Sequence, residues 1–126
     1  MPILHVDDEL AIREVVRRVL ETSGVTVLSA DGVRAAKVIV TSHHDVSGAF
    51  LDVQLEDGNG VELCEWIREH RPSLARRVAF VTSSSDPVML EHLASLGCPV
   101  LRKPFEIADL RRLAAVWEQA TNGAFS

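Results

Sequence analysis

The chain has 126 residues, of which 47% are hydrophobic and 25% are charged, and its formal net charge is −5. These values are typical of one globular domain and argue against a disordered chain. The negative charge disfavours direct binding to nucleic acid, because phosphate contacts need a basic surface. No apolar run approaches the ~18 residues of a membrane-spanning helix, so we expect no membrane partner.

The start of the chain and the cysteines bear on the compartment. Met1-Pro2-Ile3 leads into an acidic segment rather than a signal peptide. Two cysteines, Cys64 and Cys98, form neither a disulfide framework nor a zinc site, and each lies in an apolar stretch. We therefore expect small core residues in a cytoplasmic protein.

The first third of the chain alternates apolar runs with an amphipathic segment. Ile3 to Val6 is expected to be a strand, stopped by Asp7-Asp8-Glu9. A helix follows, because its apolar residues recur every three and four positions, and Gly24 is expected to cap its end. Val25 to Leu28 is the second predicted strand, and a second helix ends near His43.

The central apolar run, Val46 to Leu51, is expected to be a strand buried on both faces, with Asp52 at its carboxyl end. Residues 54–59 contain Asp-Gly and Asn-Gly pairs, which are typical of hairpins. No alternating strand follows them, so we expect a loop that leads into a third helix ending by Pro72. Val78 to Val81 is the fourth predicted strand.

The last third contains a capped helix and a short strand. Ser85 or Asp86 can cap a helix whose first residue is Pro87, and Gly97 is expected to close it. Its apolar positions are Val88, Leu90, Leu93 and Leu96. Val100-Leu101 is the fifth predicted strand.

A final helix is expected from about Glu106. Its apolar stripe consists of Leu110, Leu113, Ala114 and Trp117. Five strands alternating with five helices predict an α/β fold, a parallel sheet covered on both faces. We expect one domain over residues 1–120 and a frayed tail over residues 121–126.

Polar side chains follow four of the predicted strands. They are Asp7 and Asp8 after the first strand, Asp52 after the third, Thr82 after the fourth and Lys103 after the fifth. Taken alone, the acidic pair could cap a helix, the threonine could close a turn and the lysine could be solvated. Because parallel strands bring their carboxyl ends to one edge, we expect these residues to form one site.

The chemistry of this set favours a magnesium ion. Three crowded carboxylates repel one another unless a cation neutralises them. An all-oxygen site suits Mg²⁺ better than zinc, which prefers histidine and cysteine. Carboxylates, a divalent cation, a lysine and a hydroxyl are the groups that phosphoryl transfer uses, since its transition state spreads negative charge over three oxygens.

Four strand-end segments also carry a resemblance to a known family. They are Leu4-His5-Val6-Asp7-Asp8-Glu9, Phe50-Leu51-Asp52-Val53, Phe80-Val81-Thr82-Ser83 and Leu101-Arg102-Lys103-Pro104-Phe105. Together, in this order, they resemble the receiver domain of bacterial two-component response regulators, from Ile3 to about Trp117. The resemblance implies a flavodoxin-like (βα)5 doubly wound sheet with strand order 2-1-3-4-5. The approach to Lys103, residues 97–101, is similar to receivers attached to hybrid sensor kinases.

The resemblance also implies a metal site. Asp8, Asp52 and the backbone carbonyl of Gln54 would be ligands of Mg²⁺, and Asp7 would help through metal-bound water.

Asp52 would then be the phosphoacceptor, while Thr82 and Lys103 would contact phosphoryl oxygens. The implied partners are a sensor histidine kinase or a histidine phosphotransfer protein, with an output domain or partner protein downstream. Such a domain catalyses its own aspartyl phosphorylation and dephosphorylation but is not a turnover enzyme. Arg13, Arg17 and the loop after Lys103 are the expected docking surface.

Three positions depart from the receiver pattern or bear on access. Glu56 stands where receivers usually carry proline, and Val100 stands where many carry tyrosine or phenylalanine. Ser83, after Thr82, is small enough to keep the site open. Without that aromatic, we expect phosphorylation to be read through movement of the loop and helix that follow Thr82.

Two alternative functions stay open at this point. A small-molecule phosphohydrolase could also use a strand-end aspartate, although the second aspartate of haloacid-dehalogenase-like enzymes is replaced here by Gln54. A receiver-like module could instead bind partners without phosphorylation. That reading predicts loss of an acidic residue or of the lysine, and neither is lost.

Overall fold

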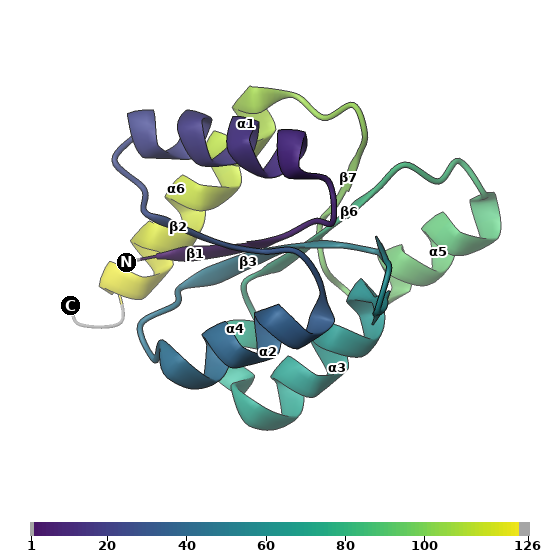
Figure 1. Ribbon diagram of the computed structural model, residues 1–126, viewed down its shortest axis with the longest axis horizontal. Coiled ribbons are helices and arrows are strands. Elements are labelled where there is room, and N and C mark those ends of the chain that lie inside the picture. Colours follow the sequence, from purple (N-terminus) through teal and green to yellow (C-terminus); the bar gives the residue numbers. More distant parts are fainter. Residues whose placement is uncertain (1, 124–126) are drawn as a thin grey trace.

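A five-stranded parallel sheet forms the centre of the molecule, in a computed structural model that describes residues 2–123. Its strands lie in the order β2-β1-β3-β6-β7 (Figure 1). Their bounds are β1 Ile3–Val6, β2 Val27–Ala30, β3 Gly48–Asp52, β6 Val78–Thr82 and β7 Val100–Arg102. Counted among parallel strands alone, this is the order 2-1-3-4-5, so the predicted flavodoxin-like fold is confirmed.

Helices cover both faces of the sheet. One face carries α1, Leu10–Thr22, and α6, Ile107–Gly123, and the other carries α2, Val33–Ser42, and α3, Gly60–His70 (Figure 1). The second face also carries the short α4, Pro72–Ala75, and α5, Pro87–Ser95. Within residues 2–123, none of these helices combines the length and apolar character needed to cross a bilayer.

The central strand β3 is buried at all five positions, which explains its uninterrupted apolar sequence. Phe50 faces the α1 and α6 side, where its ring centroid lies 4.8 Å from that of Trp117. Leu51 points into the cluster under α2 and α3. Gly48 is required for this packing, because a Cβ there would lie 2.3 Å from the Trp117 ring.

The second strand begins two residues later than predicted. The Val25 N–H donates to the Leu20 carbonyl at 3.0 Å, and Gly24 has a left-handed φ of +84°. Gly24 therefore caps the end of α1, as predicted. The cap extends one residue further than predicted and includes Val25. The strand occupies Val27–Ala30, where Ile3 of β1 pairs with Val27.

The loop over residues 54–59 contains a short hairpin, so the rejection of the hairpin pattern was wrong. β4, Gln54–Leu55, pairs antiparallel with β5, Gly58–Asn59. Each strand is only two residues long, which is too short to show an alternating pattern in the sequence. The turn between them is Glu56-Asp57, and Asn59 then caps α3 by accepting from the Glu62 N–H at 2.8 Å.

The last third follows the sequence closely, with one exception. Asp86 caps α5, accepting from the Val88 N–H at 3.0 Å, and Pro87 is the first helical residue. Val88 itself is 75% exposed and is not an apolar anchor of that helix. The predicted stripe of α6 is confirmed by its buried side chains, Leu110, Ala114 and Trp117. Residues 121–123 belong to α6, and residues 124–126 of the predicted tail lie outside the described part.

Asp57 of the hairpin turn supplies the missing cap of α2. Its two carboxylate oxygens accept from the N–H groups of Val33 at 2.8 Å and Arg34 at 3.1 Å. Gly32 precedes them, and a Cβ there would lie 2.5 Å from Asp57 Oδ1. These two N–H donors lower the pKa of the Asp57 carboxyl.

We predict that Asp57→Ala lowers the melting temperature at neutral pH, because α2 loses both acceptors of its first turn. Since the folded-state pKa lies below the ordinary 3.8, the contribution is present above that value and is lost as the pH falls through the folded pKa. Thermal melts of wild type and variant should therefore converge in acid. Asp45→Ala, at an exposed aspartate before β3, is the control, and a gap that persists unchanged below pH 3.8 would contradict the assignment.

Candidate functional site

The predicted site residues gather at the carboxyl edge of the sheet. Asp7 and Asp8 follow β1, Asp52 is the last residue of β3, Thr82 is the last of β6 and Lys103 follows β7. β1, β3, β6 and β7 are hydrogen-bonded neighbours in that order. Residues far apart in sequence therefore meet in the crevice where ligands bind in open α/β sheets.

Three carboxylates form the acidic part of the site. Oxygens of Asp7, Asp8 and Asp52 all lie within 4.8 Å of one another. Asp7 is fully buried, Asp52 is 5% exposed and Asp8 is half-buried. Such crowding of like charges is unfavourable unless positive charge is brought to it.

Lys103 supplies that charge. Its Nζ lies 2.9 Å from Asp7 Oδ2 and 3.0 Å from Asp52 Oδ2, and only 13% of the side chain is exposed. Burial lowers the pKa of the Lys103 ammonium, but the two carboxylates outweigh it and raise that pKa above its ordinary value. Lys103 therefore remains charged and bridges the first and third strands. Its backbone N–H also donates to the Thr82 carbonyl at 2.8 Å, which fixes the start of its loop.

Burial raises the pKa of Asp52, and the charge of Asp7 adds to the rise. The hydrogen bond from Lys103 opposes it, as does the Gln54 N–H, which donates to Asp52 Oδ1 at 3.3 Å. The ionised carboxylate is thus held in a site that lacks enough positive charge for it. A divalent cation would remove this cost.

The loop after Asp52 runs tightly along the site. The Gly60 N–H donates to the Val53 carbonyl at 2.9 Å, and a Cβ on Gly60 would lie 2.4 Å from the Asp52 carbonyl oxygen. Glycine is therefore needed for this close approach. Gln54 lies two residues after Asp52 in this loop. The role of its backbone carbonyl as a metal ligand stays a prediction.

Thr82 lies on the strand next to Asp52 and is 1% exposed. Its Oγ1 accepts from the Ser84 N–H at 3.0 Å, so the hydroxyl proton remains available for donation. The role predicted for Thr82 at a phosphoryl oxygen is compatible with this position and remains a prediction.

Sequence reasoning placed two residues beside the site neither as ligands nor as supports: Arg13, which it assigned only to docking, and His5. Arg13 Nη1 donates to the Asp7 carbonyl at 2.6 Å, which ties α1 to the end of β1. His5 is 1% exposed, and burial lowers its pKa to about 4, so it is neutral at physiological pH. The position of His5, two residues before Asp7 on the same strand face, could have indicated burial beside the site.

The donor set fits Mg²⁺. Asp7, Asp8 and Asp52 offer only oxygen, two of them deeply buried, and the described residues bring no histidine or cysteine into the cluster. Hard oxygen ligands that leave room for water match the preference of Mg²⁺.

Comparison with known proteins decides the family. The sequence matches the response regulator receiver domain over residues 3–115. The chain belongs to this family. A receiver domain accepts a phosphoryl group in two-component signalling, so membership of this family disfavours the phosphohydrolase alternative.

Relatives of the receiver domain match most of its length. It is 34% identical to the transcriptional regulatory protein GltR of Pseudomonas aeruginosa, over 94% of the chain and 49% of GltR. It is 40% identical to the photosynthetic apparatus regulatory protein RegA of Rhodobacter capsulatus, over 86% of the chain and 58% of RegA. The chain thus spans about half the length of these relatives.

A solved structure shows the same fold. The response regulator receiver domain protein from Clostridium thermocellum superposes with a TM-score of 0.85 at 23% identity, covering 96% of each chain.

We predict that Lys103→Met destabilises the receiver domain, because Asp7 and Asp52 lose their shared cation. The expected loss of unfolding free energy is roughly 2 kcal/mol, below the cost for a fully buried pair since Lys103 keeps some solvent contact. Added Mg²⁺ should restore more stability to the variant than to wild type. Denaturant unfolding with and without Mg²⁺ measures both effects.

Lys37→Met is the matched control, since Lys37 only lies over the Trp66 ring at 5.5 Å and should cost at most about 1 kcal/mol. Equal stability of the Lys103→Met variant and wild type without Mg²⁺ would contradict the prediction.

Proposed function

We propose that Asp52 is the phosphoacceptor and takes its phosphoryl group from a phosphohistidine of a sensor kinase or histidine phosphotransfer protein. The observation that carries this proposal is the position of the Asp52 carboxylate: 5% exposed, at the strand end, and 3.0 Å from Lys103 Nζ. Among the three carboxylates, Asp52 is the one at the centre of the sheet, between β1 and β6.

The proposed step is an in-line displacement at phosphorus. A carboxylate oxygen of Asp52 forms the new P–O bond while the P–N bond to the donor imidazole breaks and its electron pair stays with the ring. Lys103 and the Thr82 hydroxyl would stabilise charge on the phosphoryl oxygens. Asp7, Asp8, Asp52 and the Gln54 carbonyl would hold Mg²⁺, which when bound neutralises the charge of carboxylates and phosphoryl group.

The expected result with acetyl phosphate and Mg²⁺ is a mass gain of one phosphoryl group on the receiver domain. Asp52→Asn should abolish the gain, because an amide is not a nucleophile toward phosphorus, whereas the control Asp45→Asn should keep it. Intact-protein mass spectrometry measures both. Phosphorylation of the Asp52→Asn variant at the wild-type rate would disprove the assignment.

We propose that the phosphorylated state is read through the segment from Ser83 to Gly97. The Ser84 N–H bonds the Thr82 hydroxyl oxygen, so a hydroxyl that turns toward a phosphoryl group would act directly on this segment. Val100 is half-buried on the neighbouring β7 and offers no aromatic ring to rearrange.

Amide hydrogen exchange tests this readout. We expect residues 83–97 to change protection on phosphorylation, because their hydrogen bond to Thr82 is remade. Identical exchange of that segment in both forms would contradict the proposal.

We further propose that partners dock on α1 and the loop after β7. A groove of about 480 Å³ lies there, lined by apolar residues of both elements and by Lys103. Its lining residues are Ala11, Ile12, Val15, Lys103, Pro104 and Phe105. Val15 is 52% exposed, and an exposed apolar position on a charged helix suits a partner helix.

Arg17→Glu should slow phosphotransfer from the kinase but leave acetyl phosphate labelling unchanged, because the altered charge affects encounter and not chemistry. Arg13 is less suitable for this test, since it already bonds the Asp7 carbonyl. Unchanged transfer from the kinase would remove Arg17 from the docking surface.

We also propose a cytoplasmic location and a domain that spans residues 1–120.

A further inference from the structure

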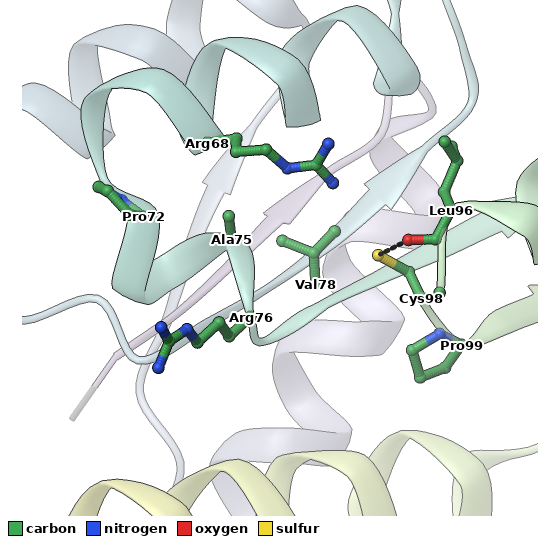
Figure 2. A pocket seen from close by; sticks show the side chains of 9 residues that line it. Arg68, Pro72, Ala75, Arg76, Val78, Leu96, Cys98 and Pro99 are labelled. Atoms are coloured by element: carbon green, nitrogen blue, oxygen red, sulfur yellow. Dashed lines mark hydrogen bonds between the residues drawn. The ribbon is translucent and has the colours of Figure 1, made fainter.

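A second cavity lies at the opposite edge of the sheet from the acidic site. It measures about 390 Å³ and is bounded by α3, α4, the amino end of β6 and the connection from α5 to β7 (Figure 2). Its volume falls within the range of small-molecule sites. Its floor is apolar, with Val78, Leu96 and Pro99 among the lining residues.

The charged side chains of this cavity are arginines. Arg68 of α3 and Arg76 after α4 line it, both are exposed, and no acidic residue is among the lining residues. Among the described residues, neither guanidinium forms an ion pair. The chain as a whole carries a net charge of −5, but this cavity is lined by two guanidinium groups without an acidic partner in residues 2–123. Their positive charge makes the cavity complementary to an anion.

A thiol completes the cavity. Cys98 is partly exposed on its wall, and its Sγ makes a long, weak contact of 3.9 Å to the Leu96 carbonyl (Figure 2). Behind it, the Cys64 thiol is 3% exposed in the core and is in hydrogen-bonding contact with Cys98. Of the two thiols, only Cys98 is therefore open to a reagent in the cavity.

We propose that this cavity is a modification site at which Cys98 forms a mixed disulfide with a small thiol that carries carboxylates, of the glutathione class, held by Arg68 and Arg76. The Cys98 thiolate attacks one sulfur of the oxidised small-molecule disulfide. The new S–S bond forms as the old one breaks, and one reduced thiolate leaves. The co-reactant is the small-molecule disulfide itself, which is reduced.

The second cysteine allows the adduct to persist. Burial, with a contribution from Cys98, raises the pKa of the Cys64 thiol to about 11. Cys64 is thus almost wholly protonated at neutral pH and attacks the mixed disulfide only slowly, since the thiolate is the nucleophile. The structure favours an adduct on Cys98 over a Cys64–Cys98 disulfide.

The test compares three disulfides that differ in charge, at about pH 8, where thiol–disulfide exchange proceeds readily. Glutathione disulfide is anionic, 2-hydroxyethyl disulfide is neutral and cystamine is cationic. Adduct formation on the folded chain is followed by mass spectrometry, and each rate is divided by the rate with the urea-unfolded chain. We expect a preference of roughly fivefold for glutathione disulfide over the neutral reagent, and a larger one over cystamine, from two partly solvated ion pairs.

Variants locate the effect. Cys98→Ser should abolish the adduct and Cys64→Ser should retain it with the same preference. The double variant Arg68→Gln/Arg76→Gln should lose the charge preference but still react, while Arg18→Gln, an exposed arginine on α1, should behave as wild type. Equal normalised rates for the three reagents, an adduct on Cys64, or loss of two hydrogens without an adduct would each overturn the proposal. None of these readouts depends on phosphorylation of Asp52.

Discussion

The Lys103 ammonium between Asp7 and Asp52 is the interaction on which the rest of the site depends. Three carboxylates would not stay together at the end of a sheet without it, since their mutual repulsion acts where solvent is largely excluded. One lysine compensates only part of that charge. The acidic edge therefore remains receptive to a divalent cation, and the burial and the Asp7 charge that raise the pKa of Asp52 also favour binding of Mg²⁺.

The sequence was sufficient to predict the sheet and the membership of the site because both depend on strand ends. A buried parallel strand leaves an unbroken apolar run, as in β3, and the residue after it must lie at the ligand-binding edge. Asp52 and Lys103, 51 positions apart, were predicted to meet on that ground alone, and they are 3.0 Å apart. The comparisons then gave the family.

The remaining features depend on contacts that a local pattern does not record. β2 begins late because the Val25 N–H donates to the Leu20 carbonyl at the end of α1. The same N–H group cannot also pair with a neighbouring strand. Val88 is exposed although it is apolar, since α5 packs on the core through Leu93, with Met89 and Leu96 partly buried beside it. The contact from Asp57 to α2 spans 24 residues, and only the absence of a capping side chain before Val33 could have indicated it.

That contact ties the turn beyond Asp52 to the first turn of α2. Free-energy coupling between two places is reciprocal, so whatever orders the turn at the acidic edge also strengthens the start of α2, and a ligand that grips α2 tightens the turn. α2 lies on one face of the sheet, and α1, on which docking is proposed, lies on the other face. The Asp57 contact therefore links the turn beside the acidic edge to the face of the sheet that lies opposite the proposed docking surface.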